Sequence, residues 1–161
     1  MSPTTTTGIG WDSHRLAAGR RLVLGGVEIP FERGLEGFSD ADVLAHAVTD
    51  ALLGAAALGD IGRHFPDTDP RWEGADSLAL LRAVVAMLAE RGLAAVHVDA
   101  TVLMERPRLA PHRDAIRARL SEALGLGPAH VNVKASTGEG MGFVGRGEGV
   151  AALAVASVTA R

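Results

Sequence analysis

The sequence predicts an α/β fold, an α+β two-layer sandwich in which a mixed β-sheet is covered by three helices. Two observations predict it. Three stretches carry apolar residues at helical spacing, and between them lie shorter runs that alternate or are continuously apolar, as in strands. Interspersed helices and strands bury their apolar faces against one another in two layers. With 161 residues, 47% of them hydrophobic, the length fits one domain over residues 1–161, and we expect residues 1–7 to be flexible.

The first third of the chain predicts strands. A threonine-rich lead runs into Gly8–Asp12, and β-branched residues of this kind favour an extended strand. In Arg21–Ile29, the pair Gly25-Gly26 separates two apolar runs, which predicts a tight hairpin. Pro30 then ends the second strand of that hairpin.

Two helices follow. Ser39 or Asp40 can cap the first, whose apolar positions continue to about Leu58, where Gly59 stops it. Residues 59–70 are polar and rich in helix breakers, so we expect a loop. Residues 76–92 predict a second amphipathic helix that begins at Asp76 or Ser77 and ends at Gly92.

The last third alternates between the two element types. Residues 94–104 predict a strand, 111–124 a helix closed by Gly125, and 130–135 another strand. Residues 137–149 contain six glycines, and the apolar run over 150–158 predicts a final strand.

Composition excludes several classes of chemistry. The chain has no cysteine, so thiolate catalysis, Cys-ligated metals and disulfides are absent. Sixteen basic and nineteen acidic residues are scattered along it, and aromatic residues make up 4%, so we expect no nucleic-acid partner. Met1 to Thr7 do not resemble the start of a signal peptide, and no apolar run reaches about 18 residues. We therefore expect a soluble, cytoplasmic protein with no membrane partner.

Two short patterns could bind a metal. If Asp12 and His14 end a strand, their side chains point to one face, although a surface aspartate beside an unrelated histidine has the same spacing. Together with His46 they offer two imidazoles and one carboxylate, which suits zinc with a fourth position for a substrate oxygen. Asp42 and Asp50 stand four residues on either side of His46, either as a solvated stripe or as hydrogen-bond acceptors that orient its ring.

The glycine-rich segment could bind phosphate. Its backbone N–H groups can approach an anion closely, and Thr137, Glu139 and Arg146 add a hydroxyl, a potential Mg²⁺ ligand and a bidentate donor. The segment fits no standard nucleotide-binding motif, and a flexible turn would have the same composition. Ser39, near the start of the first helix, offers a hydroxyl to an anion as well.

Taken together, these residues resemble a known family, the 2-C-methyl-D-erythritol 2,4-cyclodiphosphate synthases of non-mevalonate isoprenoid biosynthesis. The resemblance covers about residues 8–155 in one order. Its segments are GIGWDSHRL, LGGVEIP, SDADVLAHAVTDALLGAAALGDIG, FPDTDP, GADS, PRLAPH and VNVKASTGEGMGFVGRGEGVA.

The resemblance implies a homotrimer of α/β subunits with active sites between neighbouring subunits. It implies one Zn²⁺ per subunit on Asp12, His14 and His46, and Mg²⁺ or Mn²⁺ with the substrate phosphates, for which Glu139 is the protein ligand. The implied reaction is the metal-assisted cyclisation of 4-diphosphocytidyl-2-C-methyl-D-erythritol 2-phosphate to the cyclic 2,4-diphosphate, with release of CMP. Such an enzyme is a phosphorus–oxygen lyase.

The resemblance also assigns residues. Thr137 would donate to the transition state, and Phe143, Arg146 and Glu148 would line a cavity on the three-fold axis that would hold an isoprenoid diphosphate. The positions that match substrate contacts are Asp12, Ser13, His14, Phe38, Ser39, Asp60, Ile61, Gly62, Phe65, Pro66, Asp67, Thr68, Asp69, Met104, Arg108, Leu109, Ala110, Ser136, Thr137, Gly138, Glu139, Phe143 and Arg146.

One departure matters. The family has a histidine with a transition-state role where this chain has Phe38, which cannot donate a hydrogen bond. Losing one such donor lowers a rate by about 10²–10³. The alternative interpretations are a non-catalytic trimer that binds isoprenoid or nucleotide phosphates, which Phe38 favours, and a zinc phosphohydrolase, which would need a base poised over water.

Overall fold

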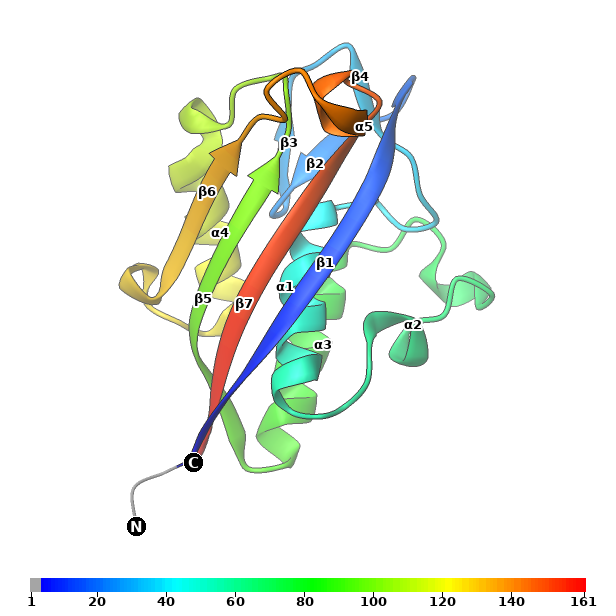
Figure 1. The fold of residues 1–161 in the computed structure, drawn as a ribbon. Helices are drawn as coiled ribbons and strands as arrows, with labels where there is room; N and C mark the ends of the chain where they lie inside the picture. The colour runs from blue at the N-terminus through cyan, green and yellow to red at the C-terminus, as the bar shows by residue number, and fades with distance from the viewer. Residues whose placement is uncertain (1–3) are drawn as a thin grey trace.

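The computed structural model describes residues 4–161. It confirms the α/β sandwich with a mixed sheet, and Figure 1 shows the helices behind one face of that sheet. The five-stranded sheet has the order β4-β1-β7-β5-β6, and β2 and β3 form a separate hairpin. The strands are β1 (Thr5–Ala18), β2 (Leu22–Leu24), β3 (Val27–Ile29), β4 (Arg33–Leu35), β5 (Leu93–Leu103), β6 (Val131–Ser136) and β7 (Gly149–Ala160).

Three long helices cover the sheet, as predicted: α1 (Val43–Ala55), α3 (Ser77–Glu90) and α4 (Arg113–Leu124). Two short helices were not predicted, α2 (Ile61–His64) within the expected loop and α5 (Gly142–Gly145) within the glycine-rich segment. Strand β1 pairs antiparallel with both β4 and β7, β7 pairs antiparallel with β5, and only β5 and β6 run parallel among the described strands. None of the three long helices covers the opposite face of the sheet (Figure 1).

The predicted start of the first helix is wrong. Neither Ser39 nor Asp40 caps α1; the N-cap is Asp42, whose carboxylate accepts the backbone N–H of Ala45. The helix also ends at Ala55 rather than near Leu58, because Ala57 adopts a left-handed conformation with φ of 55° and turns the chain away.

The expected flexibility of residues 1–7 is wrong for Thr5–Thr7, and residues 1–3 lie outside the described part of the chain. Thr5, Thr6 and Thr7 pair with Thr159, Val158 and Ser157 of β7. These threonines therefore belong to β1, which follows β7 over almost the whole length of that strand. Their β-branched side chains suit the extended backbone.

Helix α1 lies unusually close to β1 because two glycines of that strand face it. A Cβ at Gly8 would meet the carbonyl oxygen of Ala51 at 2.2 Å, and a Cβ at Gly10 would meet that of Ala47 at 1.9 Å. Both distances are far below any contact between real atoms. The helix backbone therefore occupies the space that side chains at these two positions would fill, and this brings His46 to the strand.

None of the helices within residues 4–161 is both long and apolar enough to cross a membrane. The apolar core instead lies between the sheet and the three long helices, where the inward side chains of α1, α3, β5 and β7 are buried.

We predict that Gly10→Ala destabilises the protein by about 3 kcal/mol, because the added methyl group forces α1 away from the sheet. The matched control is Gly54→Ala on helix α1. There the new Cβ would have its nearest neighbour at 3.7 Å, so the substitution should stabilise the fold by about 0.5–1 kcal/mol. Urea unfolding of both variants measures the difference, and equal stabilities would contradict the close-contact interpretation.

Candidate active site

Asp12, His14 and His46 meet at the contact between β1 and α1. Oδ2 of Asp12 lies 2.8 Å from Nε2 of His14 and 2.9 Å from Nδ1 of His46, and the two nitrogens are 3.4 Å apart. All three residues are half-buried, and their ligand atoms lie close enough to share one metal ion. The alternation of β1 turns Asp12 and His14 to the helix side, as the sequence predicts.

Hydrogen bonds on the far side of each ring fix how these histidines face the site. Nδ1 of His14 lies 2.9 Å from the carbonyl oxygen of Glu36, which can only accept, so this nitrogen carries the proton. In the neutral ring the lone pair of His14 is then on Nε2, the nitrogen beside Asp12, and when that nitrogen is protonated it donates to the carboxylate. Nε2 of His46 lies 2.7 Å from the hydroxyl of Ser77 and 3.1 Å from that of Ser39, which leaves Nδ1 facing Asp12.

The charges of the three groups depend on one another. Burial raises the pKa of Asp12, but hydrogen bonds and charge from His14 and His46 outweigh it and lower the pKa to about 2. Burial lowers the pKa of His14, but the hydrogen bond and charge of Asp12 outweigh it, so the pKa is raised. A carboxylate oxygen and two ring nitrogens that converge in this way can share one cation. A divalent metal with tetrahedral preference fits this donor set.

The prediction that Asp42 and Asp50 orient His46 is wrong. Both carboxylates bind backbone elsewhere: Asp50 accepts the N–H of Ile61 at 2.8 Å, which holds the start of α2. Asp42 is fully buried and accepts N–H groups of Gly25 at 2.9 Å and Gly26 at 2.7 Å. It therefore ties the turn of the β2–β3 hairpin to the N-terminus of α1. Burial raises the pKa of Asp42 to about 6 despite these donors.

A pocket of about 560 Å³ opens beside the three ligand atoms. His14, Ser39 and His46 form its metal side, and α2 with the loop after it forms the opposite wall. The resemblance matches residues 60–62 and 65–69 to the methylerythritol end of the substrate, and residues 104–110 and 136–139 to the cytidine and phosphate pocket. Of the first group, Ile61, Gly62, Phe65, Pro66, Asp67 and Thr68 line this pocket. Phe38, which is 38% exposed, and Trp72 and Leu80 make the walls largely apolar.

Two residues of that predicted group lie outside the lining and have other contacts. Asp60 caps α2 by accepting the N–H of Arg63 at 3.0 Å. Asp69 caps the short turn that follows and pairs with Arg71 at 2.6 Å, which lowers the pKa of Asp69.

The residues matched to the cytidine and phosphate positions form a second pocket, of about 170 Å³, at the carboxyl ends of β5 and β6. Met104, Arg108, Leu109, Ala110, Ser136 and Thr137 line it. Beside it, the Gly138 N–H donates to the Glu105 carboxylate, and the Glu139 N–H donates to the Thr137 hydroxyl at 3.2 Å. Glu139 is exposed and adopts a left-handed conformation with φ of 53°.

The two pockets lie at the same end of the sheet but on different strands. His14 of β1 pairs with Val150 of β7, and Leu103 of β5 pairs with Ala151 of β7 and with Ser136 of β6. Three strand spacings of about 4.8 Å therefore separate β1 from β6, about 14 Å in all. Within one chain, Thr137 and Glu139 are not brought to the three candidate metal ligands.

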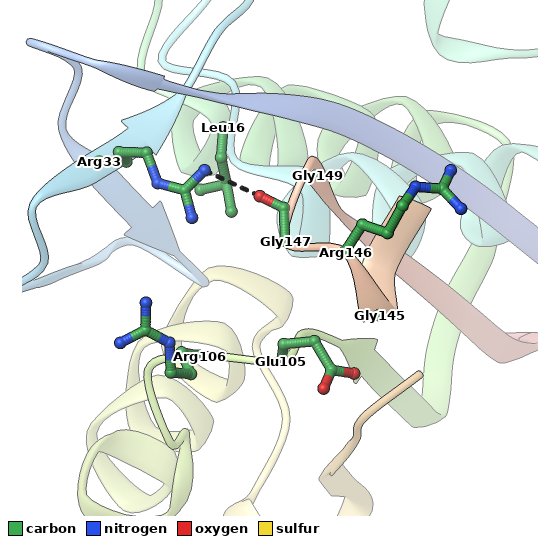
Figure 2. A pocket seen from close by; sticks show the side chains of 8 residues that line it. All are labelled: Leu16, Arg33, Glu105, Arg106, Gly145, Arg146, Gly147 and Gly149. Atoms are coloured by element: carbon green, nitrogen blue, oxygen red, sulfur yellow. Dashed lines mark hydrogen bonds between the residues drawn. The ribbon is translucent and has the colours of Figure 1, made fainter. Parts of the chain in front are cut away.

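Three further residues border other hollows. Ser13 and Phe143 line a small one beside His14 on the strand side away from α1. Arg146 borders a pocket of about 240 Å³ with Arg33, Glu105 and Arg106, but Figure 2 shows its guanidinium turned away, and it pairs with Glu148 at 3.0 Å. Arg33 reaches across this pocket to donate to the carbonyl of Gly147 at 2.8 Å (Figure 2).

Ser77, which contacts His46, and Asp40, which contacts Ser77, lie outside the predicted site. The sequence indicates Ser77 only as the start of a helix and Asp40 only as a cap. No spacing rule connects position 77 to position 46, because the contact depends on how α3 packs against α1.

The chain is similar in sequence to known enzymes. The bifunctional enzyme IspD/IspF of Anaeromyxobacter dehalogenans (strain 2CP-C) is 65% identical over 97% of this chain, which spans only 40% of that protein. The 2-C-methyl-D-erythritol 2,4-cyclodiphosphate synthase of Symbiobacterium thermophilum is 61% identical over 96% of this chain and 98% of its own length.

Solved structures of similar proteins have the same fold as this chain. The bifunctional IspDF from Campylobacter jejuni superposes with a TM-score of 0.95 at 40% identity, covering 99% of this chain and 43% of that one. A CDP-bound 2C-methyl-D-erythritol-2,4-cyclodiphosphate synthase gives 0.86 at 41% identity, over 93% of this chain and 97% of that one. The YgbB family profile matches residues 5–159. This chain therefore belongs to the YgbB family.

Proposed function

We propose that this protein cyclises 4-diphosphocytidyl-2-C-methyl-D-erythritol 2-phosphate to 2-C-methyl-D-erythritol 2,4-cyclodiphosphate and releases CMP. One observation carries the proposal: the convergent Asp12, His14 and His46 open directly onto the pocket formed by residues 61–68. Two proteins named 2-C-methyl-D-erythritol 2,4-cyclodiphosphate synthase are 61% and 60% identical to this chain over 96% of its length. This similarity supports the same assignment.

Asp12, His14 and His46 would hold one Zn²⁺, and Glu139 would contribute to a site for Mg²⁺ or Mn²⁺ at the substrate phosphates. When bound, these ions supply positive charge that orients the phosphates and neutralises developing negative charge. The nucleophile belongs to the substrate: an oxygen of the 2-phosphate bonds to the β-phosphorus, and the bond from that phosphorus to the CMP oxygen breaks. The protein must therefore bring the two ends of a polyanion together.

The chain's own residues position and neutralise the substrate. The Thr137 hydroxyl accepts the N–H of Glu139, so its own proton would be free to donate to the phosphoryl group during transfer. The pocket beside His14 and His46 would take the methylerythritol end, and the pocket between Met104 and Thr137 would take the cytidine end. Phe38 would contribute an apolar wall and no hydrogen bond. Neutralising the negative charge of the phosphates would therefore depend on the metals and the remaining donors.

A homotrimer would complete the active site. The two pockets of one chain lie on strands three spacings apart, so a second copy supplying its Met104–Thr137 pocket next to His14 would join them. The face of the sheet that the three long helices leave uncovered supports this assembly. It exposes the cross-strand pairs Ile9–Val155 and Trp11–Leu153, with Trp11 52% exposed, although they are large and apolar. Phe143, Arg146 and Glu148 would then face a central cavity suited to an isoprenoid diphosphate.

A second candidate function is a non-catalytic trimer that binds isoprenoid or nucleotide phosphates. Phe38 favours it, because this side chain lines the pocket at the position where the family carries a transition-state histidine. The retained Asp12, His14, His46, Thr137 and Glu139 favour catalysis.

Phosphorus NMR tests the function directly. The purified protein, incubated with the substrate and Mg²⁺, is expected to produce the cyclic diphosphate and CMP, and prior removal of metal by a chelator should abolish both products. Thr137→Val should bind zinc normally while kcat falls by about 10²–10³. Unchanged substrate with zinc still bound would favour the binding protein, and linear products would favour a hydrolase.

Zinc affinity should fall in acid. The pKa of His14 is raised above 6.5, so a proton occupies the metal-free site below that raised pKa and must leave before zinc binds. We expect the affinity to decrease about tenfold per pH unit below this pKa and to level off above it. Competition with a chromophoric chelator from pH 5 to 8 measures this. The exposed His130, changed to Ala, should keep the same profile; a flat profile for the wild-type protein would refute the prediction.

Trp11→Glu should dissociate the trimer, because the substitution places a charge in the exposed apolar face of the sheet. Light scattering after size exclusion should report monomers, and turnover should be lost while zinc binding to each chain remains. The control Ala86→Glu changes an exposed position of α3 on the other side of the molecule and should leave a trimer. A monomeric wild-type protein with full activity would overturn the shared-site arrangement.

A further inference from the structure

We propose that Ser77 and Asp40 are positioning residues for His46: the carboxylate of Asp40 orients the hydroxyl of Ser77, which in turn fixes the ring of His46 for metal binding. The proposal deepens the metal site described above and rests on it. It assigns a role to two side chains outside the set of ligands and substrate contacts predicted from the sequence.

The direction of each hydrogen bond follows from the acceptor at the end of the chain. Asp40 accepts the backbone N–H of Asp42 at 3.1 Å on Oδ1 and that of Ser77 at 3.0 Å on Oδ2, so both of its oxygens act as acceptors. The Ser77 hydroxyl, which also contacts Oδ1, therefore donates its proton to Asp40. Its lone pairs then face His46, and the Nε2–H of that ring donates to them across 2.7 Å.

This order leaves Nδ1 of His46 without a proton. That nitrogen is the atom that lies 2.9 Å from Asp12 and 3.4 Å from Nε2 of His14, where a metal ligand is needed. A neutral imidazole with its other nitrogen donating to a fixed acceptor is the usual state of a metal-bound histidine. On His14 the carbonyl oxygen of Glu36 has the same role.

Ser39 is the competing partner, since its hydroxyl lies 3.1 Å from the same nitrogen. Three observations favour Ser77. Its distance to Nε2 is shorter, it is fully buried in the first turn of α3, and its proton is directed by Asp40. The Ser39 hydroxyl accepts the N–H of Ala41 at 3.2 Å and lines the pocket, so it is available to a substrate oxygen.

The backbone holds both positioning residues rigidly. Asp40 donates its own N–H to the carbonyl of Ala75 at 3.1 Å, two residues before Ser77. The start of α3 and the segment that leads into α1 are thus joined by three hydrogen bonds between Asp40 and residues 75 and 77. The contact from Ser77 to His46 starts from this connection. Loss of the hydroxyl should therefore free the ring without dissociating the two segments.

Zinc affinity tests the proposal without reference to turnover. Ser77→Ala should weaken zinc binding by about 10- to 100-fold in competition with a fluorescent chelator. The matched control is Ser121→Ala, which removes a buried serine hydroxyl of α4 that has no hydrogen-bond partner, and it should bind zinc as the wild-type protein does. Ser39→Ala should leave zinc affinity within about twofold while raising KM.

Cobalt spectra separate positioning from a general loss of structure. With Co²⁺ in place of zinc, Ser77→Ala should change the visible absorption bands, which report ligand geometry, while Ser121→Ala should not. The thermal midpoints of the metal-free variants check folding. If Ser77→Ala does not fold, Asp40→Asn carries the test, with a loss of zinc affinity toward the lower end of the same range.

Equal zinc affinities for Ser77→Ala and Ser121→Ala would overturn the proposal, as would a loss confined to Ser39→Ala. A wild-type protein that binds no zinc would overturn the positioning role and the metal site together. A wild-type protein that binds zinc tightly, loses that affinity in Ser77→Ala and yet does not cyclise the substrate would leave the positioning role standing and refute the proposed function alone.

Discussion

The close contact between α1 and β1 is the constraint on which the candidate site depends. Gly8 and Gly10 give the helix backbone the space that side chains would occupy, and the next two residues on the same face of β1 are Asp12 and His14. His46 lies on the helix just before the turn that contacts Gly10. One face of β1 therefore first contacts the helix and then supplies two candidate ligands. Helix packing and metal binding consequently depend on the same register of this strand. A slip of one residue would turn both ligands to the opposite face.

Three carboxylates, of which Asp42 is fully buried, hold the elements around this contact. Asp42 binds the turn of the β2–β3 hairpin, Asp50 binds the start of α2, and Asp40 binds the start of α3. Each accepts backbone N–H groups that would otherwise stay unpaired near the core, which costs about 1–3 kcal/mol per group. The acidic residues near the N-terminus and along the face of α1 are thus mainly connections between α1 and its neighbours, and only Asp12 of β1 lies at the centre of the site.

The sequence was sufficient for the fold class, the three long helices and the cluster of Asp12, His14 and His46, because periodicity and alternation are local properties of the chain. It failed where the partner is set by tertiary packing. Spacing alone placed Asp42 beside His46, whereas the ring turns toward Ser77 of a different helix. The separation of Thr137 from the metal ligands is likewise a property of strand order, which puts β7 and β5 between the two pockets.

The character of the pocket bears on the choice between cyclisation and hydrolysis. A hydrolase needs a base poised over a water molecule at the metal. Here the wall opposite the histidines is formed by Ile61, Phe65 and Trp72, and Phe38 extends this apolar surface instead of adding a polar group. Such a wall disfavours ordered water and favours a nucleophile carried by the substrate. Phe38 cannot donate a hydrogen bond, but it excludes water from the pocket. It is therefore compatible with a reaction whose attacking oxygen arrives with the substrate, because excluding water protects the phosphoryl group from hydrolysis.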